Sequence, residues 1–218
     1  MTPSKEDYLK KIIELGGERR IISNKELSIA MNVSAASVTD MNNRLLKEKY
    51  ITYIPYKGVQ PTKRGLTTGN KLIRKHRLWE VFLSEKLGYK WEDVHGEAEL
   101  LEHHTSDILA EKLNDFLGNP THDPHGGAIP TKDGEKVEED VTALTEIELD
   151  VSFKIHEVND DKELLEYLSL KNLELQTPYI LKEVDDYDGL ITLITIEGHE
   201  KQLSYKAAQQ IFVEPVYD

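Results

Sequence analysis

The chain has 218 residues, a formal net charge of −13 at neutral pH and no cysteine. This length can bury a substantial core and can divide into two or three domains. The lack of thiols excludes disulfides and zinc ribbons, and no apolar run is long enough to span a membrane. Because the charged N-terminus also lacks the apolar stretch of a signal peptide, we expect a cytoplasmic protein with no membrane partner.

Charge is divided unevenly along the chain. Residues 1–75 hold 15 Lys and Arg against 7 Asp and Glu, a formal charge of +8, whereas residues 76–218 hold 12 against 33, a formal charge of −21. Such asymmetry is typical of a basic, nucleic-acid-binding module on an acidic body. A bias in surface charge without any function would give the same totals, so the motifs must decide.

The first 65 residues predict a winged helix-turn-helix. A helix is expected over residues 3–15, because proline is tolerated in a first turn and a glycine pair ends the pattern. Two short helices, capped by Asn24 and Ser34 and joined by a tight turn, are expected within residues 24–49. Aromatic and β-branched residues on both sides of a turn at Lys57 then predict a hairpin, which is the wing.

The second short helix carries small polar side chains on its outer face. Short side chains let a helix approach base edges in the major groove, while nearby lysines and arginines can meet phosphates. The candidate DNA-contacting residues are Lys25, Ser34, Ala36, Ser37, Thr39, Asp40, Asn43, Arg44, Lys57 and Arg64. Asp40 could accept a hydrogen bond from a cytosine amino group or could simply face solvent, and the sequence leaves both open.

The remaining chain predicts a helical body and a small β domain. Residues 62–117 are helical in pattern and hold more apolar side chains than a helix pair needs, so we expect a subunit interface; a symmetric dimer suits a helix-turn-helix. A connector rich in Gly, Pro and charge follows. Strands are then predicted at residues 151–158, 177–185, 190–197 and 201–205, with a helix at residues 162–170, in a mostly antiparallel arrangement.

Histidines and carboxylates gather in the middle of the chain. Six of the eight histidines lie between residues 76 and 125. At helical spacing, His95, Glu99, Glu102 and His103 share a stripe, which costs charge repulsion unless a divalent ion is bound. A solvated helix face is the alternative for any single pair. Because the donors are oxygen and imidazole nitrogen without sulfur, we predict Mn²⁺, with Fe²⁺ second.

Catalytic signatures are missing from the sequence. It contains neither H-E-x-x-H nor its inverted form, and no G-x-S-x-G, P-loop or Rossmann fingerprint; the helical region has a single E-x-x-H, from Glu92 to His95. We therefore predict a structural and regulatory ion, no enzyme activity and no small organic substrate. Two other classes stay open: a metal-storage protein or metalloenzyme, and a constitutive DNA-binding or scaffold protein.

Several segments resemble one known family. "TPSKEDYLKKI", "RKHRLWEVFL", "VHGEAELLEHHTSDILAEKLNDFLG" and "DPHGGAIP", together with the winged helix, resemble the diphtheria toxin repressor family, closest to its manganese-responsive branch. The resemblance runs nearly end to end and implies a mainly α protein with a small β domain. It implies a winged helix-turn-helix DNA-binding domain at residues 1–72, a helical metal-binding and dimerisation domain at 73–142, and an SH3-like (FeoA-like) β-barrel at 143–218.

The resemblance also implies a function. We expect a homodimeric repressor of metal-uptake genes that binds a palindromic double-stranded DNA operator when Mn²⁺ is bound, with Zn²⁺ or Cd²⁺ as surrogate ions. An iron-responsive repressor is the alternative. The implied primary site is Asp7, Glu99, Glu102 and His103. Iron-responsive members carry Met and Cys where this chain has Asp7 and Glu99, although Asp7 could also form a capping box with Ser4.

A second metal site is implied less uniquely. One form of it uses His76, Glu80, His95, Glu157 and Asp160. In close relatives a variant uses Glu80, a cysteine, His125 and Asp160. Asp123 stands here at the cysteine position, so an oxygen would replace the thiolate and weaken the binding of softer metals.

Overall fold

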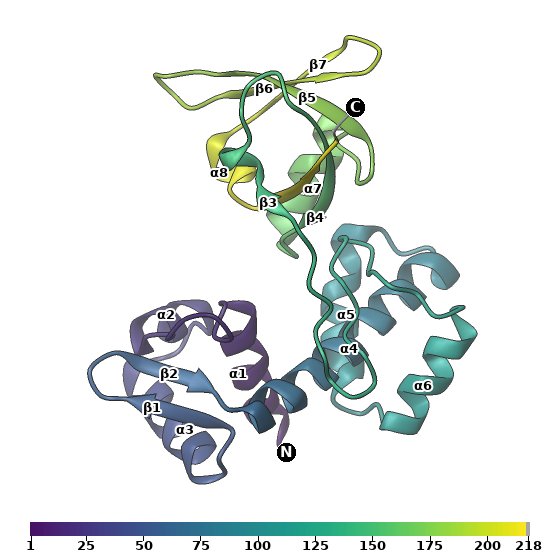
Figure 1. The fold of residues 1–218 in the computed structure, drawn as a ribbon. Helices are drawn as coiled ribbons and strands as arrows, with labels where there is room; N and C mark the ends of the chain where they lie inside the picture. The colour runs from purple at the N-terminus through teal and green to yellow at the C-terminus, as the bar shows by residue number, and fades with distance from the viewer. Residues whose placement is uncertain (217–218) are drawn as a thin grey trace. The chain divides into compact units, whose positions relative to one another are not determined.

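The computed structural model describes residues 1–216, which form two compact units (Figure 1). The N-terminal unit comprises residues 1–79, 99–119 and 129–137, and the C-terminal unit comprises residues 80–98, 120–128 and the chain from residue 138 on. Helices α4 (Lys63–Leu87) and α5 (Val94–Glu102) contribute residues to both units. Within residues 1–216, no helix is long and apolar enough to cross a membrane.

The N-terminal unit contains a winged helix. Its elements are α1 (Pro3–Glu14), α2 (Asn24–Ala30), α3 (Ala35–Lys47), the antiparallel strands β1 (Ile51–Ile54) and β2 (Gly58–Pro61), parts of α4 and α5, and α6 (Asp107–Phe116). Leu9 and Ile12 of α1 share one buried core with Val38 and Leu45 of α3. Each such side chain contributes about 2 kcal/mol when buried. Because one core holds both helices, the placement of α1 fixes that of α3. The predicted helix-turn-helix and hairpin are confirmed.

Local signals explain where these elements begin. The cap of α2 is Ser23, so our prediction of Asn24 was wrong by one residue. The reason is Glu26: its carboxylate accepts from the Ser23 backbone N–H at 2.9 Å, while Ser23 Oγ accepts from the Glu26 N–H at 3.2 Å. Ser34 caps α3 as predicted. In the wing, Gly58 has φ +140°, and a Cβ there would lie 2.1 Å from the Ile22 carbonyl oxygen, so only glycine fits.

The C-terminal unit is built on a six-stranded antiparallel sheet. Its elements are η1 (Trp91–Asp93), β3 (Thr142–Ala143), η2 (Leu144–Glu146), β4 (Ser152–Val158), α7 (Lys162–Lys171), β5 (Pro178–Val184), β6 (Ile191–Thr195), β7 (Glu200–Leu203), α8 (Tyr205–Ala208) and β8 (Ile211–Pro215). The strand order is β3-β8-β4-β5-β6-β7. The four predicted strands and the predicted helix are present. Strands β3 and β8 were not predicted, although β8 lies inside the sheet beside β4.

One loop is fastened to β4 of this sheet. The Val158 N–H donates to the His125 carbonyl at 2.9 Å, and a Cβ at Gly126 (φ +88°) would lie 1.9 Å from the His156 carbonyl oxygen. The pairing of β4 with β8 also shifts register between Ile155 and Glu157, which is a β-bulge at His156. Bulges re-aim side chains. The loop of residues 120–128 therefore meets β4 where several histidines and carboxylates lie.

Candidate metal centres

The first candidate centre lies in the N-terminal unit, and we call it the Asp7 cluster: Asp7, Glu102 and His103. Asp7 lies in the first half of α1, Glu102 is the last residue of α5, and His103 follows it. His103 Nε2 lies 2.9 Å from Asp7 Oδ1 and 3.5 Å from Glu102 Oε1. The three ligand atoms lie within 4.8 Å of one another. Two carboxylates and an imidazole from separate helices thus face one small volume.

Glu102 is the most informative member of this cluster, because its side chain is fully buried. Its Oε2 accepts from Lys10 Nζ at 2.8 Å and lies 2.6 Å from His76 Nδ1. Its Oε1, which faces His103, has no hydrogen-bond partner in the described part of the chain. A buried carboxylate oxygen without a partner is costly, so this atom fits a cation.

The electrostatics of Asp7 point the same way. Burial raises the pKa of Asp7 above its usual value, and the negative charges of Glu102 and Glu99 raise it further, against the lowering effect of His103 and Lys10. Glu6 lies 2.8 Å from His103 Nδ1 and so orients the imidazole with Nε2 toward Asp7. A bound cation would stabilise the ionised Asp7 carboxylate, which burial and the neighbouring negative charges disfavour.

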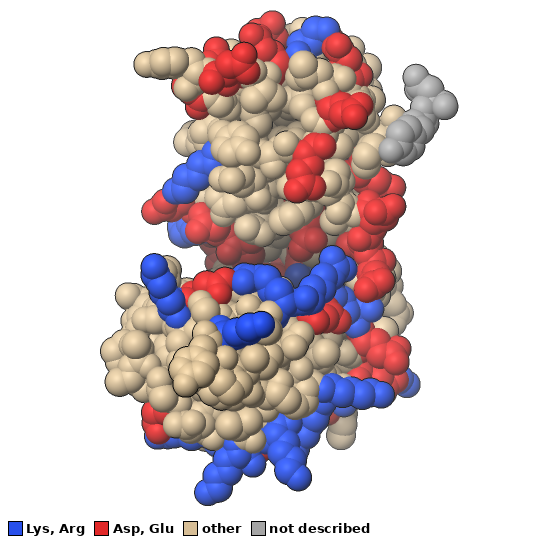
Figure 2. All heavy atoms as spheres, turned by 60° about the vertical axis from the view of Figure 1, so that its left-hand side comes forward, with Lys and Arg blue, Asp and Glu red and all other residues tan. Residues whose placement is uncertain are grey.

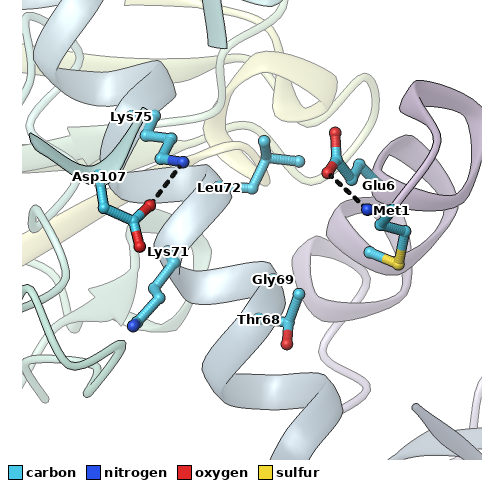
Figure 3. A pocket seen from close by; sticks show the side chains of 8 residues that line it. All are labelled: Met1, Glu6, Thr68, Gly69, Lys71, Leu72, Lys75 and Asp107. Atoms are coloured by element: carbon cyan, nitrogen blue, oxygen red, sulfur yellow. Dashed lines mark ion pairs between the residues drawn. The ribbon is translucent and has the colours of Figure 1, made fainter. Parts of the chain in front are cut away.

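A small cavity lies beside Glu6, the residue that contacts His103 (Figure 3). It has a volume of about 200 Å³ and lies between the start of α1 and α4. Its lining includes Glu6, which is 4.0 Å from the terminal amine of Met1, and Lys75, which is 2.8 Å from Asp107. Because Glu6 and Asp107 are each paired with a cation of the chain, we assign no separate metal centre to this cavity.

The second candidate centre lies in the C-terminal unit, and we call it the His125 cluster: Glu80, Asp123, His125 and Asp160. His125 Nδ1 lies 3.8 Å from Glu80 Oε1, 4.0 Å from Asp123 Oδ1 and 3.9 Å from Asp160 Oδ1. His125 Nε2 donates to the Trp91 carbonyl at 2.8 Å, so in the neutral imidazole the lone pair is on Nδ1. Nδ1 is buried and lacks a hydrogen-bond partner within residues 1–216. An imidazole lone pair among three carboxylates is a metal-ligand arrangement.

Asp123 also has a structural task. Its Oδ1 accepts from the backbone N–H groups of His125 at 2.8 Å and Gly127 at 3.0 Å, which shapes the loop. His95 pairs with Asp160 and lies 3.9 Å from Glu80 Oε1. His95 therefore belongs with the His125 cluster.

The predicted stripe on α5 does not form one centre. His103 follows the last residue of the helix, Glu102, and faces Asp7 within the N-terminal unit. His95 faces Asp160, and both belong to the C-terminal unit. Three other predicted ligands, Glu99, His76 and Glu157, are members of neither cluster as defined above. Glu99 is exposed, His76 contacts Lys10 and Glu102, and Glu157 is in none of the groups of ligand atoms that lie within 4.8 Å of one another in residues 1–216.

The predicted DNA-contacting residues are all exposed, on or beside α3 and the wing. Several of them already have partners: Arg44 pairs with Asp40 at 2.6 Å, Ser34 Oγ lies 2.9 Å from Ser37 Oγ, and Arg64 lies 4.5 Å over the Tyr50 ring. In Figure 2, Lys and Arg gather over the winged-helix part, and Asp and Glu dominate the β domain. The ion pair with Arg44 partly offsets the negative charge of Asp40, which would otherwise repel a phosphate.

Sequence reasoning missed several residues that complete these sites. Lys10 lies on the buried face of α1 between Leu9 and Ile12, and a lysine on an apolar helix face could have predicted a buried carboxylate partner. Glu6 and the Trp91 carbonyl act through tertiary contacts that no local pattern announces. A third group, His122, Glu139 and His156, was also missed.

A winged helix with an exposed recognition helix, together with buried His–carboxylate clusters, defines a metal-binding transcription regulator. Comparisons with known proteins agree. Residues 1–59 match "Iron dependent repressor, N-terminal DNA binding domain", and residues 62–131 match "Iron dependent repressor, metal binding and dimerisation domain". The transcriptional regulator MntR of Bacillus subtilis is 33% identical over 116 residues, covering 53% of this chain and 81% of MntR.

Solved structures extend the likeness to the whole chain. The manganese regulator SloR is 38% identical with a TM-score of 0.84, covering 99% of this chain and 100% of SloR. ScaR with bound Zn²⁺ is 40% identical with a TM-score of 0.85, covering 97% and 99%. The chain belongs to the diphtheria toxin repressor family of iron-dependent repressors, as the resemblance predicted, and the mainly α fold with a small β domain is confirmed.

Proposed function

We propose that this chain is a Mn²⁺-dependent, homodimeric repressor that binds a palindromic DNA operator and controls genes of metal-ion uptake. The observation that carries the proposal is the buried Oε1 of Glu102, which faces Asp7 and His103 without a hydrogen-bond partner among the described residues. The proposed domains are residues 1–72 for DNA binding, 73–142 for metal binding and dimerisation, and 143–218 for the SH3-like part.

Mn²⁺ is the proposed ion because of the donors. The proposed primary ligands are Asp7, Glu99, Glu102 and His103, and the proposed secondary ligands are Glu80, Asp123, His125 and Asp160, with His95 beside them. Both sets are rich in carboxylate and free of sulfur, which suits Mn²⁺. SloR is named a manganese regulator, and ScaR is described with Zn²⁺ and with Cd²⁺ bound. Fe²⁺ is the alternative effector, with Zn²⁺ or Cd²⁺ as surrogates.

The proposed control of DNA binding by the metal depends on which helices carry the ligands. A divalent cation supplies positive charge and coordination bonds at the Asp7 cluster. Asp7 would bind this ion from α1, and Glu102 and His103 would bind it from the end of α5. Because α1 shares its core with α3, holding Asp7 also holds the recognition helix. Without the ion, repulsion between Asp7 and Glu102 favours looser placements of α1. DNA selects one placement, so metal and DNA binding are coupled reciprocally, typically by ~1–3 kcal/mol.

The dimer is proposed to use an apolar surface of the N-terminal unit. Leu100, Ile108 and Phe116 are 68%, 78% and 66% exposed. Large exposed apolar side chains, here on α5 and α6, are typical of a subunit interface. The family domain over residues 62–131 is described as a dimerisation domain. A two-fold dimer would present two copies of α3 to a palindrome.

DNA contacts are proposed for the exposed residues around α3. Ser37 and Asn43 would reach base edges, whereas Lys25, Lys57 and Arg64 would meet phosphates. We further propose that the chain acts in the cytoplasm and has no catalytic activity. The relatives that it matches are transcription regulators rather than enzymes.

The test is an operator-binding titration followed by fluorescence anisotropy. DNA fragments from upstream of metal-transporter genes are titrated with metal-free protein, and then with protein given Mn²⁺, Fe²⁺ or Zn²⁺. Mn²⁺ should strengthen binding by at least tenfold, and EDTA should reverse the gain. Binding that ignores EDTA would contradict the proposal, and a larger gain with Fe²⁺ would replace it with the iron-responsive alternative.

A further inference from the structure

A third group of ligand-type side chains lies in the C-terminal unit, apart from the proposed Mn²⁺ ligands. We call it the His156 cluster: His122, Glu139 and His156. His122 Nε2 lies 2.5 Å from Glu139 Oε1, and His156 Nε2 lies 3.0 Å from Glu139 Oε2. The two imidazole rings are edge to face with centroids 5.4 Å apart. Three segments thus converge: the loop of residues 120–128, the end of the connector just before β3, which carries Glu139, and β4.

Hydrogen bonding alone does not account for this cluster. His156 Nδ1 and Nε2 are both buried, and neither has a hydrogen-bond partner in the part of the chain that the structure describes. Nε2 is near Glu139 Oε2 but the geometry is not that of a hydrogen bond. A histidine that merely supported the loop would satisfy its nitrogens, because an unsatisfied buried polar atom costs about 1–3 kcal/mol. A buried imidazole nitrogen without a hydrogen bond, 3.0 Å from a carboxylate oxygen, is suited to binding a cation.

The surroundings of the cluster fit a ligand site. His122 Nδ1 lies 2.9 Å from Thr121 Oγ1, and His156 Nδ1 lies 3.9 Å from Glu214 Oε2. The Thr121 hydroxyl at the far ring nitrogen of His122 is the kind of oxygen partner that orients a metal-ligating histidine. The β-bulge at His156 aims its side chain toward the loop.

We propose that His122, Glu139 and His156 form a third divalent-cation site, selective for a Zn²⁺-class ion rather than Mn²⁺. Two imidazoles and one carboxylate are a common zinc ligand set that leaves a fourth position for water. With metal–ligand bonds of about 2.0–2.1 Å, tetrahedral ligand atoms are about 3.3 Å apart. The three ligand atoms here already lie within 4.8 Å of one another. Small side-chain rotations would therefore complete the site.

The contrast in donors sets the selectivity. The Asp7 and His125 clusters each supply more carboxylates than imidazoles from their proposed ligands, whereas the His156 cluster supplies two imidazoles and one carboxylate. Imidazole favours the later first-row ions, and zinc binds such sites more tightly than manganese. A bound ion would fasten the connector and the loop to β4. That loop also carries Asp123 and His125, so the third site would hold the ligands of the second in place.

The experiment counts zinc ions in the full-length protein. Metal-free wild type, His122→Gln, His156→Gln and the control His199→Gln are titrated with Zn²⁺ by calorimetry, and bound zinc is measured after gel filtration. His199 is an exposed histidine outside the three clusters. Both cluster variants should bind one zinc fewer per chain than wild type, and His199→Gln should bind the same number. Equal zinc content in all four proteins would overturn the proposal.

A second measurement covers the case in which a cluster variant fails to fold. Crystals of the wild-type protein grown with Zn²⁺ are measured on both sides of the zinc absorption edge. We expect an anomalous peak within bonding distance of His122 Nε2, Glu139 and His156 Nε2. Zinc peaks confined to the other two clusters would reject the third site. Neither readout depends on DNA binding, so the Mn²⁺ repressor proposal and this one can fail separately.

Discussion

The Asp7 and His125 clusters arrange similar side chains in different ways. In the Asp7 cluster, the chain supplies its own cation, because Lys10 Nζ donates to the buried Glu102 carboxylate at 2.8 Å. In the His125 cluster, a backbone carbonyl fixes the imidazole, so that Nδ1 faces three carboxylates at 3.8–4.0 Å. The first site is partly neutralised and includes a residue of α1, whereas the second joins α4, the loop of residues 120–128 and Asp160. The difference predicts a regulatory first site and a structural second one.

The largest expected effect comes from breaking the buried ion pair. Glu102→Gln should lower the free energy of unfolding of the metal-free protein by about 3 kcal/mol, because Lys10 would remain buried without its carboxylate. Urea unfolding in EDTA measures this. The double variant Lys10→Met/Glu102→Gln should recover part of the loss, since no unpaired charge remains. If the double variant is less stable than Glu102→Gln, the pair is not the reason for the loss.

The second prediction concerns selectivity at the His125 cluster. Asp123→Cys should shift the relative affinity of that site toward Zn²⁺ or Cd²⁺ over Mn²⁺ by on the order of 10–100-fold, because a thiolate is a softer donor. Competition titrations with a fluorescent chelator give the ratio. Asp123→Asn is the matched control, since its amide oxygen can still accept from the His125 N–H without the softer donor. An unchanged ratio in Asp123→Cys would mean that residue 123 only shapes the loop.

The third prediction uses the raised pKa of Asp7. Burial is its first cause, and the charges of Glu102 and Glu99 add to it. Binding needs the ionised carboxylate, so Mn²⁺ affinity is lost as pH falls through this raised pKa, at a higher pH than for an ordinary aspartate. For the metal-free protein the sign is reversed: stability falls as pH rises through it, because the unfolded chain releases the proton more readily.

Carbon NMR of the Asp7 carboxyl in metal-free protein follows this titration directly. Its midpoint should lie above that of an ordinary aspartate in wild type and should move down in Glu99→Gln, which removes one nearby negative charge. An Asp7 midpoint at or below the ordinary value would remove the electrostatic basis of the first site.

The smallest expected effect lies outside both clusters. The capping box at Ser23 lowers the pKa of Glu26 to about 2, so its contribution to stability is present above the unfolded pKa of 4.5 and is lost as pH falls toward 2. Glu26→Gln should cost about 0.5 kcal/mol, since the group is exposed and screened. Thermal unfolding at neutral pH should show the same small loss with and without Mn²⁺. A loss that depends on Mn²⁺ would mean that α2 takes part in the metal response.

Sequence patterns predicted the elements with strong local signals. Proline and glycine bounded α1, Ser34 capped α3, and alternating apolar residues marked β4 to β7. Strand β3 has only two residues and β8 ends in proline, so neither has a clear pattern. The resemblance implied Asp7 and His125 as ligands. The predicted stripe is divided between two clusters, and His103 lies just after the end of α5. Lys10, Glu6 and the His156 cluster depend on tertiary contacts, which spacing along one helix does not reveal.

The central claim is that Asp7 links the metal to the recognition helix. The most direct test compares operator affinity with and without Mn²⁺ for wild type, Asp7→Ala and the control Glu14→Ala, which removes an exposed carboxylate from the same helix. Wild type and Glu14→Ala should gain roughly 5–150-fold in affinity. Asp7→Ala should stay folded and dimeric and gain nothing. Full Mn²⁺ stimulation of Asp7→Ala would contradict the account.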